Sequence, residues 1–302
     1  MINYIQTDSE RIMYEMNVLV LGGTRFMGRH LIAELLRKGH RVTMATRGNA
    51  ADDFGDAVNR LRFDRTDEES ILSVFCGMHF DVVFDSLAYC SRDVKILLDH
   101  LSCSRYVMIS TTAVYRKHIN TVESDFDPLA EPVIWCDRTV FPYAEMKRQA
   151  ERALFLEYGD RNFVAVRFPF VIGPDDYTKR LRFYVEHVLN GKPVYTDNYD
   201  AQMGFVRSDE AGRFLAFFAE NAFVGAVNGA SCGTVSIKEL SEYVKGKCGK
   251  ELIISDDGDV APYNGEAPYS INTELASSLG FAFTPLQEWF WQLVDHYLGE
   301  MN

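Results

Sequence analysis

The sequence predicts a doubly wound α/β fold, with a parallel sheet covered by helices on both faces and a smaller α/β lobe toward the C-terminus. Three observations support this fold class. Short, almost wholly apolar runs recur through the first half of the chain, as is typical of parallel strands buried on both faces. Segments of helical periodicity separate these runs, so crossover connections are expected between neighbouring strands. After Gly173 the strict alternation ends and helical segments predominate.

The first half supplies the expected sheet and its covering helices. The predicted strands cover 17–21, 41–46, 61–63, 81–85, 106–110 and 163–167. The predicted helices cover 26–38, 68–75, 93–101 and 143–158. In the first helix Met27, Leu31 and Leu35 follow helical spacing, and Gly39 is a typical residue just past a helix end.

The second half is expected to form the lobe beside the sheet. Helical patterns cover 180–189, 209–218, 237–245 and 285–298. We therefore divide the chain into three parts: an N-terminal extension (1–16), a sheet-forming core (17–170), and a mainly lobe-forming part (171–302), some of whose elements return to the core.

Composition restricts the classes of protein to consider. Of the 302 residues, 47% are hydrophobic and 25% are charged, as is usual for a globular protein. No apolar run reaches the roughly 18 residues that a membrane span needs. Residues 1–16 lack the apolar stretch of a secretory signal. We therefore expect a cytoplasmic protein without membrane contact.

Charge and cysteine usage point the same way. The formal net charge of −12 disfavours nucleic acid as a partner, because a polyphosphate backbone is repelled on average. The six cysteines form no C-x-x-C pair and lie near no histidine cluster with metal-ligand spacing. Reduced thiols and no metal site are expected.

A glycine-rich turn joins the first strand to the first helix. A residue without Cβ permits a tight turn and lets a pyrophosphate approach the backbone, while the helix N-terminus offers free N–H groups. The alternative is a plain strand-to-helix turn. We favour a dinucleotide site, although Arg25 stands where such turns usually have a third glycine. The predicted site consists of Gly22, Gly23, Thr24, Arg25, Phe26, Met27 and Gly28.

The end of the second strand bears on which dinucleotide is bound. An NAD site usually has a carboxylate there for the ribose 2′-hydroxyl, but residues 44–48 contain none. Arg47 suits a 2′-phosphate instead, and Arg25 could assist it. NADP is therefore favoured, with NAD as the alternative if Arg47 is merely solvated. Asp64 follows the third strand, where it could accept a hydrogen bond from the adenine amine.

Tyr143 and Lys147 form a candidate acid/base pair. Their spacing places both side chains on one face of a helix. A phenol needs a pKa about 3 units below its usual value to act as a base near neutral pH, which requires roughly 4 kcal/mol of differential interaction. The same spacing recurs at Tyr243 and Lys247, so the pattern alone is weak. Tyr143 follows the fifth strand, whose carboxyl end should face the cofactor.

Together these segments resemble the extended short-chain dehydrogenases/reductases of the NAD-dependent epimerase/dehydratase family, which share the Rossmann fold. The resemblance covers nearly the whole chain after Met16. The form of the glycine turn, Gly-Gly-Thr-Arg-Phe-x-Gly, looks like that of an atypical branch that includes RNA-binding relatives. The segments that carry it are 22–28, Asp64, 81–88, 110–115, 143–147 and 167–174.

The resemblance implies a role for each candidate residue. Tyr143 would be the acid/base, and Lys147 would bind the nicotinamide ribose and lower the phenol pKa. Thr111 would orient the substrate oxygen, because family members carry a hydroxyl four residues before the counterpart of Tyr115; the alternative is that it only satisfies the turn backbone. Further cofactor contacts are implied for Ser86, Leu87, Ala88, Phe168 and Pro169.

The resemblance implies hydride transfer between a nicotinamide cofactor and a secondary alcohol or ketone, on a small molecule such as a sugar or sugar nucleotide. Epimerisation, dehydration and reduction all stay open. Met203 replaces an arginine that grips the diphosphate in the family's sugar-nucleotide enzymes, which weakens the case for a UDP-sugar. The alternatives are a non-catalytic NADP-binding regulator or an RNA-associated protein on the same fold. A homodimer through the helix at Tyr143 is also consistent with the family.

Overall fold

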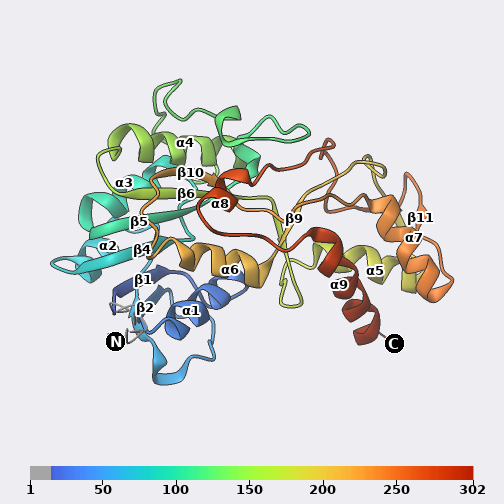
Figure 1. Cartoon of the computed structure of the whole chain (residues 1–302), viewed down its shortest axis with the longest axis horizontal. Coiled ribbons are helices and arrows are strands. Elements are labelled where there is room, and N and C mark those ends of the chain that lie inside the picture. Colours follow the sequence, from blue (N-terminus) through green and yellow to red (C-terminus); the bar gives the residue numbers. More distant parts are fainter. Residues whose placement is uncertain (1–14, 302) are drawn as a thin grey trace, which may run out of the picture.

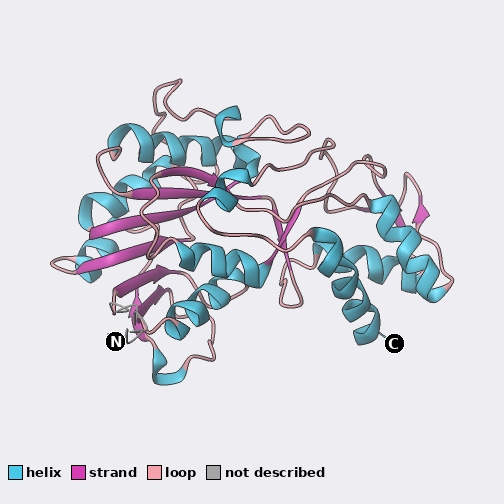
Figure 2. Cartoon of the chain, viewed as in Figure 1, coloured by secondary structure: helices cyan, strands magenta, loops and turns pink. Residues whose placement is uncertain are grey.

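A seven-stranded parallel sheet forms the larger half of the protein in the computed structural model, which describes residues 15–301 (Figures 1 and 2). The strand order is β10-β6-β5-β4-β1-β2-β3, and each neighbouring pair is parallel. The predicted extension lies outside the described residues, apart from Glu15 and Met16. The strands are β1 (Asn17–Leu21), β2 (Arg41–Thr46), β3 (Asn59–Arg62), β4 (His79–Asp85), β5 (Ser102–Thr111), β6 (Phe163–Phe168) and β10 (Gly225–Asn228).

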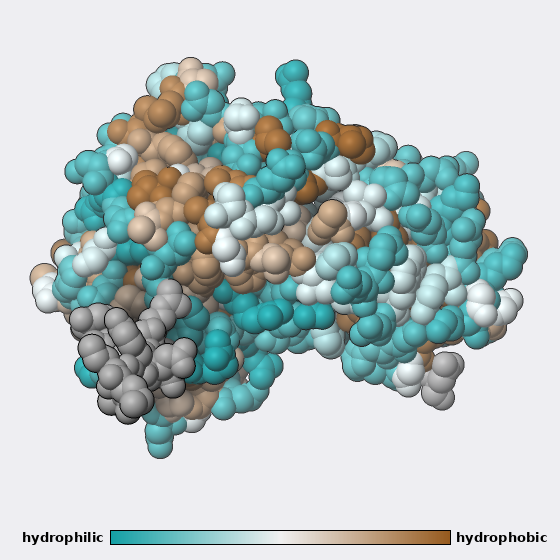
Figure 3. All heavy atoms as spheres, in the orientation of Figure 1, coloured by the Kyte–Doolittle hydropathy of each residue, from teal (hydrophilic) through white to brown (hydrophobic). Residues whose placement is uncertain are grey.

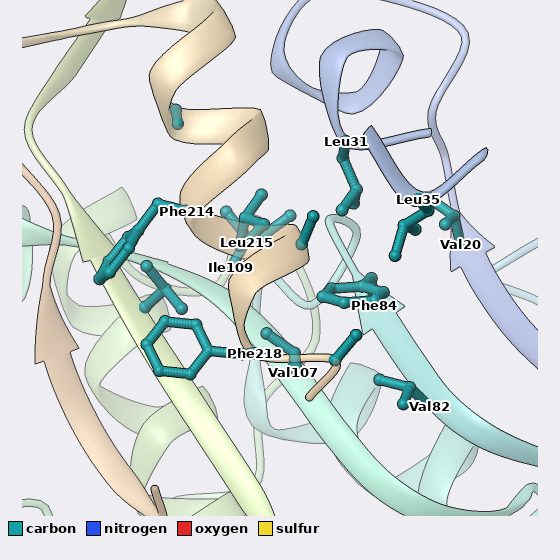
Figure 4. Close-up of a cluster of buried hydrophobic side chains, with 14 of the residues drawn as sticks. Val20, Leu31, Leu35, Val82, Phe84, Val107, Ile109, Phe214, Leu215 and Phe218 are labelled. Atoms are coloured by element: carbon teal, nitrogen blue, oxygen red, sulfur yellow. The ribbon is translucent and has the colours of Figure 1, made fainter. Parts of the chain in front are cut away.

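Helices cover both faces of this sheet. On one face lie α1 (Met27–Arg37) and α6 (Ser208–Phe217), and on the other lie α2 (Glu68–Phe75), α3 (Ser91–His100) and α4 (Tyr143–Glu157). Strand β1 shows why: Val18 and Val20 pack into the α1 side, while Leu19 and Leu21 pack into the α3 and α4 side. The first of these two cores is drawn in Figure 4. The sheet is thus buried on both faces, as the apolar runs predict.

The order of the strands reverses at β1, which pairs with both β2 and β4. The chain runs outward from β1 to β3 on one side, then returns through β4 to β6 on the other. In open α/β sheets, the crevice at the carboxyl ends of strands beside such a reversal is where ligands bind. The fold therefore places the turn after β1 and the segment after β4 at a ready-made binding crevice.

The smaller lobe has its own apolar core. Its elements are α5 (Arg180–Asn190), α7 (Ile237–Cys248), α9 (Leu286–Met301) and five short strands. Two fully buried aromatic side chains, Tyr184 and Phe205, stand at the centre of this core, and Met203 is fully buried with them. The short strands are β7 (Phe170–Ile172) paired with β9 (Phe205–Arg207), and β8 (Pro193–Tyr195) paired with β11 (Ile253–Ile254) and β12 (Asp259–Val260).

The remaining regular elements of the described chain are short. Helix α8 (Glu274–Ser278) packs against β10, and three 3₁₀ turns cover Gly55–Ala57, Thr112–Val114 and Glu123–Asp125. In Figure 3, hydrophilic residues prevail over the lobe at the right, and hydrophobic residues gather over the sheet-bearing half. None of the helices in residues 15–301 is both long and apolar enough to span a bilayer.

Candidate active site

Two cavities open at the carboxyl ends of the strands, one on each side of the turn after β1. The first, about 350 Å³, is lined by Phe26 and Met27 and by the ends of β5 and β6. The second, about 420 Å³, is lined by Gly22, Thr24 and Arg25 and by the ends of β2 and β3. Because the turn separates them, a dinucleotide with its diphosphate on the turn would reach into both.

The glycine turn has the geometry that anion binding needs. Gly22 and Gly23 have φ values of +97° and +98°, which favour glycine. A Cβ on Gly28 would lie 2.8 Å from Cα of Gly23, so the start of α1 packs directly on the turn. No side chain of the described residues caps the N-terminus of α1, and its first turn has no acidic residue. Arg29 donates its N–H to the Phe26 carbonyl at 2.9 Å, and the first N–H groups of the helix, those of Met27 and Gly28, are therefore available to a phosphate.

The contact between Gly28 and Gly23 can be tested by adding one methyl group. We expect Gly28→Ala to lower the free energy of unfolding by about 1–3 kcal/mol, because the new Cβ meets backbone that cannot rotate away. Gly246→Ala is the matched control, since Gly246 lies within α7 with open space around it and should gain about 0.5–1 kcal/mol. Urea unfolding measures both. A Gly28→Ala protein as stable as the wild type would contradict the close contact.

Asp64, the residue predicted to meet the adenine amine, lines the second cavity. Its carboxylate accepts hydrogen bonds from the backbone N–H and the hydroxyl of Thr66, at 2.9 and 2.7 Å. These bonds lower the pKa of Asp64, and the charges of Arg47 and Arg138 add to the effect. Both bonds use the same oxygen, Oδ1, so Oδ2 can accept a further donor.

The second cavity is strongly cationic. It is lined by four arginines: Arg25, Arg47, Arg65 and Arg138. The charges of two of them are balanced by ion pairs, because Arg65 donates to Asp85 at 2.7 Å and Arg138 donates to Asp93 at 3.0 Å. Neither Arg25 nor Arg47 forms an ion pair or hydrogen bond with another described residue; Arg25 packs over the Tyr177 ring at 5.8 Å. Their two charges suit phosphate groups.

The first cavity brings together Thr111, Tyr143 and Lys147. Tyr143 begins α4, and Lys147 lies one turn further along the same face. The Lys147 ammonium is buried and donates to the backbone carbonyls of Ala88 and Ile109, at 2.7 and 2.8 Å. Burial lowers its pKa to about 8. An ammonium has three donors, so one N–H is left for a ligand.

The phenol of Tyr143 is held in its protonated form. Burial raises its pKa to about 12, even though 46% of the residue's surface is exposed, while a hydrogen bond from Thr111 and the charge of Arg180 act to lower it. Thr111 accepts the backbone N–H of Ala113 at 3.2 Å, which leaves its own O–H free to donate. The protein's own groups therefore do not lower the pKa of Tyr143 below its usual value, in contrast to the effect predicted for Lys147.

The comparison with known sequences identifies the family. A model of the NAD dependent epimerase/dehydratase family matches residues 18–230. The chain belongs to this family. This confirms the predicted resemblance, and the parallel sheet confirms the predicted fold class.

Two curated relatives from Arabidopsis thaliana are similar over part of their length. The chloroplast stem-loop binding protein of 41 kDa b is 28% identical over 229 residues, covering 70% of this chain and 56% of the relative. UDP-arabinose 4-epimerase 1 is 27% identical over 185 residues, covering 53% of this chain and 44% of the relative. The chain thus spans about half the length of these relatives.

Solved structures share the fold. The UDP-glucose 4-epimerase of Thermus thermophilus, in complex with NAD, superposes with a TM-score of 0.67 at 18% sequence identity. The match covers 93% of this chain and 99% of that structure.

The further contacts implied by the epimerase/dehydratase family fall around both cavities. Ser86 lines the first cavity and Leu87 the second, while Phe168 and Pro169 line the first. Ala88 is fully buried and acts through its carbonyl, which accepts the Lys147 ammonium. It therefore positions Lys147 and lines neither cavity.

Sequence patterns miss several residues of the first cavity. Lys147 lies 5.1 Å from the ring of Tyr89, which is one residue past the segment singled out for the cofactor. The others belong to no motif and come from distant parts of the chain: Lys117, Tyr177, Thr178, Arg180, Glu266 and Tyr269. Among the described residues no group of three or more His, Cys, Asp or Glu is placed to hold a metal ion.

Proposed function

We propose that this chain is an NADP-linked enzyme that moves a hydride between the nicotinamide and a secondary alcohol or ketone of a sugar-like molecule. The observation that carries the proposal is the convergence of Thr111, Tyr143 and Lys147 on a cavity that meets the glycine turn. The names of UDP-arabinose 4-epimerase 1 and of the UDP-glucose 4-epimerase support chemistry at a sugar carbinol.

Each of the three residues has a defined task in alcohol oxidation. The phenolate oxygen of Tyr143 would take the hydroxyl proton while the hydrogen on the carbinol carbon leaves as hydride, with the C–H electron pair, for the nicotinamide, so that a ketone forms. Thr111 donates a hydrogen bond to the reacting oxygen. Lys147 offers its free N–H to the nicotinamide ribose. When bound, oxidised NADP would supply the hydride acceptor and a positive charge that favours the phenolate. In ketone reduction the phenol returns the proton.

The preference for NADP rests on the unpaired arginines of the second cavity. Arg47 follows β2, where a carboxylate would be needed to hold the ribose 2′-hydroxyl of NAD. Among the described residues, Asp64 is the one carboxylate that lines this cavity, and the hydrogen bonds of Thr66 keep it ionised. Arg25 and Arg47 are left to meet the diphosphate and the 2′-phosphate.

Removal of the Arg47 charge should reveal this preference. We expect Arg47→Gln to weaken NADP binding about 10- to 100-fold and NAD binding little, because a charge-assisted phosphate contact is lost. Arg41→Gln is the matched control, since Arg41 lies at the opposite end of β2 and pairs with Glu15 at 3.2 Å. Isothermal titration with each dinucleotide measures the change. If the wild-type protein bound neither dinucleotide, the proposed function would be wrong.

An RNA-associated role is the second candidate, because the stem-loop binding protein of 41 kDa b is a relative. Phosphate binding in the cationic cavity alone would give weak, salt-sensitive RNA binding. The two candidates separate in one measurement, in which NADP competes with a stem-loop RNA in low salt. An RNA-associated protein should hold the RNA at saturating NADP, whereas the proposed enzyme should release it.

A further inference from the structure

One cation in the first cavity takes no part in the mechanism above. Arg180 begins α5 and lines the cavity, with its guanidinium 5.5 Å from the centre of the Phe170 ring. Within residues 15–301 it forms no ion pair and no hydrogen bond. Tyr143 lines the same cavity, and the charge of Arg180 acts to lower the pKa of its phenol. A guanidinium in a ligand cavity, with no carboxylate of its own, is suited to an oxyanion.

The loop before α5 is fixed in place. Asp175 accepts a hydrogen bond from Ser208 at 2.8 Å and lies 3.1 Å from Nε2 of His30, so the loop is tied to α6 and α1. Tyr177 of the same loop packs edge-on against Phe26 of the glycine turn. These contacts connect the loop that leads into Arg180 with α1, α6 and the glycine turn.

The other cation on this side of the cavity is already neutralised. Lys117 pairs with Glu266, and its ammonium lies 4.2 Å from the centre of the Tyr269 ring. Lys117, Glu266 and Tyr269 therefore form a part of the cavity wall with no net charge. The remaining cation, Lys147, is the one proposed to bind the nicotinamide ribose. Among the described residues that line this cavity, Arg180 is then the unpaired cation left for the substrate.

The cavity has little space for a nucleotide. Its volume of about 350 Å³ must hold the nicotinamide as well as the substrate. Met203, at the position of the expected diphosphate-binding arginine, is fully buried in the lobe core and pairs through its backbone with Val235. Met203 does not line the cavity, and its thioether has no charge with which to bind a diphosphate.

We propose that the substrate is a monosaccharide-sized or smaller alcohol or ketone that carries its own carboxylate or phosphate, held by Arg180, and that it is not a nucleotide sugar. The proposal rests on the proposed function for its reaction. To that reaction it adds the charge and the size of the substrate. The planar fork of Arg180 can bind either oxyanion through two parallel N–H groups.

The test measures binding of four probes to the NADP-saturated protein by calorimetry. D-gluconate and D-glucose 6-phosphate carry the two oxyanions, D-sorbitol is the neutral analogue, and UDP-glucose is the nucleotide sugar. We expect an anionic probe to bind at least about tenfold more tightly than sorbitol and UDP-glucose. Arg180→Gln should weaken that binding about 10- to 100-fold. The matched control is Arg182→Gln on the same helix, which pairs with Glu186 at 2.7 Å and Glu300 at 2.6 Å.

The outcomes separate the two proposals. Binding of gluconate alone identifies a carboxylate substrate, and binding of the sugar phosphate alone identifies a phosphate substrate. Equal anion binding by wild type and Arg180→Gln, or tighter binding of UDP-glucose than of either anion, would overturn the Arg180 site. Failure of NADP itself to bind would instead refute the proposed function. The same anion titration on the cofactor-free variants then still decides the role of Arg180.

Discussion

Replacement of Tyr143 by phenylalanine is expected to lower kcat for alcohol oxidation about 10²- to 10⁴-fold and to leave the Kd for NADP almost unchanged. The ring stays in the cavity, but the oxygen that takes the substrate proton is lost. Because the pKa of the phenol is raised to about 12, oxidation by the wild-type protein should become faster as pH rises and the phenolate forms. The variant should lose this dependence on pH.

The measurement follows formation of reduced nicotinamide with the best alcohol from a panel of hydroxy acids, sugar phosphates and sugar nucleotides. Tyr89→Phe is the matched control, because Tyr89 also lines the first cavity and contacts the Lys147 ammonium through its ring. It should retain most of the activity. A Tyr143→Phe protein with the wild-type rate and pH profile would remove Tyr143 from the mechanism.

Hydrophobic periodicity predicts the part of the fold that is buried on both faces. The sequence predicts strands β1, β2 and β4 to β6 because each contains enough apolar residues in succession to be recognised. Strand β10, Gly225–Asn228, is missed because its four residues include only two apolar ones and its pairing with β6 is made 61 residues away, Gly225 with Val164. The lobe strands, of two or three residues each, carry no periodicity at all.

The residues of the candidate site also divide into those that local sequence patterns predict and those that only the fold brings together. The glycine turn and the Tyr143 and Lys147 pair are local patterns whose spacing reflects one turn or one helix face. Because the Tyr–Lys spacing recurs at Tyr243 and Lys247, the position of Tyr143 after the fifth strand is also needed to select it, and Asp64 is selected by its position after the third strand. Lys117 and Glu266 meet across 149 positions. Arg180 has no such spacing to mark it, and only the fold brings it to the cavity. The pKa of Tyr143 likewise depends on tertiary burial, which raises it, while the groups that act to lower it are Thr111 and Arg180.

The ion pair between Glu151 and Arg167 should give the largest change in stability. Both side chains are fully buried, with Arg167 donating to Glu151 through Nε at 3.0 Å and through Nη2 at 2.5 Å. We expect Arg167→Met to lower the free energy of unfolding by about 3–5 kcal/mol, because it leaves a carboxylate buried without its counter-charge. Urea unfolding at neutral pH measures the loss.

The double variant Glu151→Leu with Arg167→Met decides whether the loss comes from the unpaired charge or from packing. Replacement of both ions by apolar side chains should recover most of the stability, because no charge then stays buried. Activity need not recover with it. Glu151 lies one turn beyond Lys147 on α4 and accepts the hydroxyl of Ser110, next to Thr111. A stable but slow double variant would show that the pair positions α4 against β5. A double variant as unstable as Arg167→Met would show that the unpaired charge does not dominate, and that packing and the other hydrogen bonds of Arg167, to Tyr115 and to the carbonyls of Glu123 and Phe126, carry the stability.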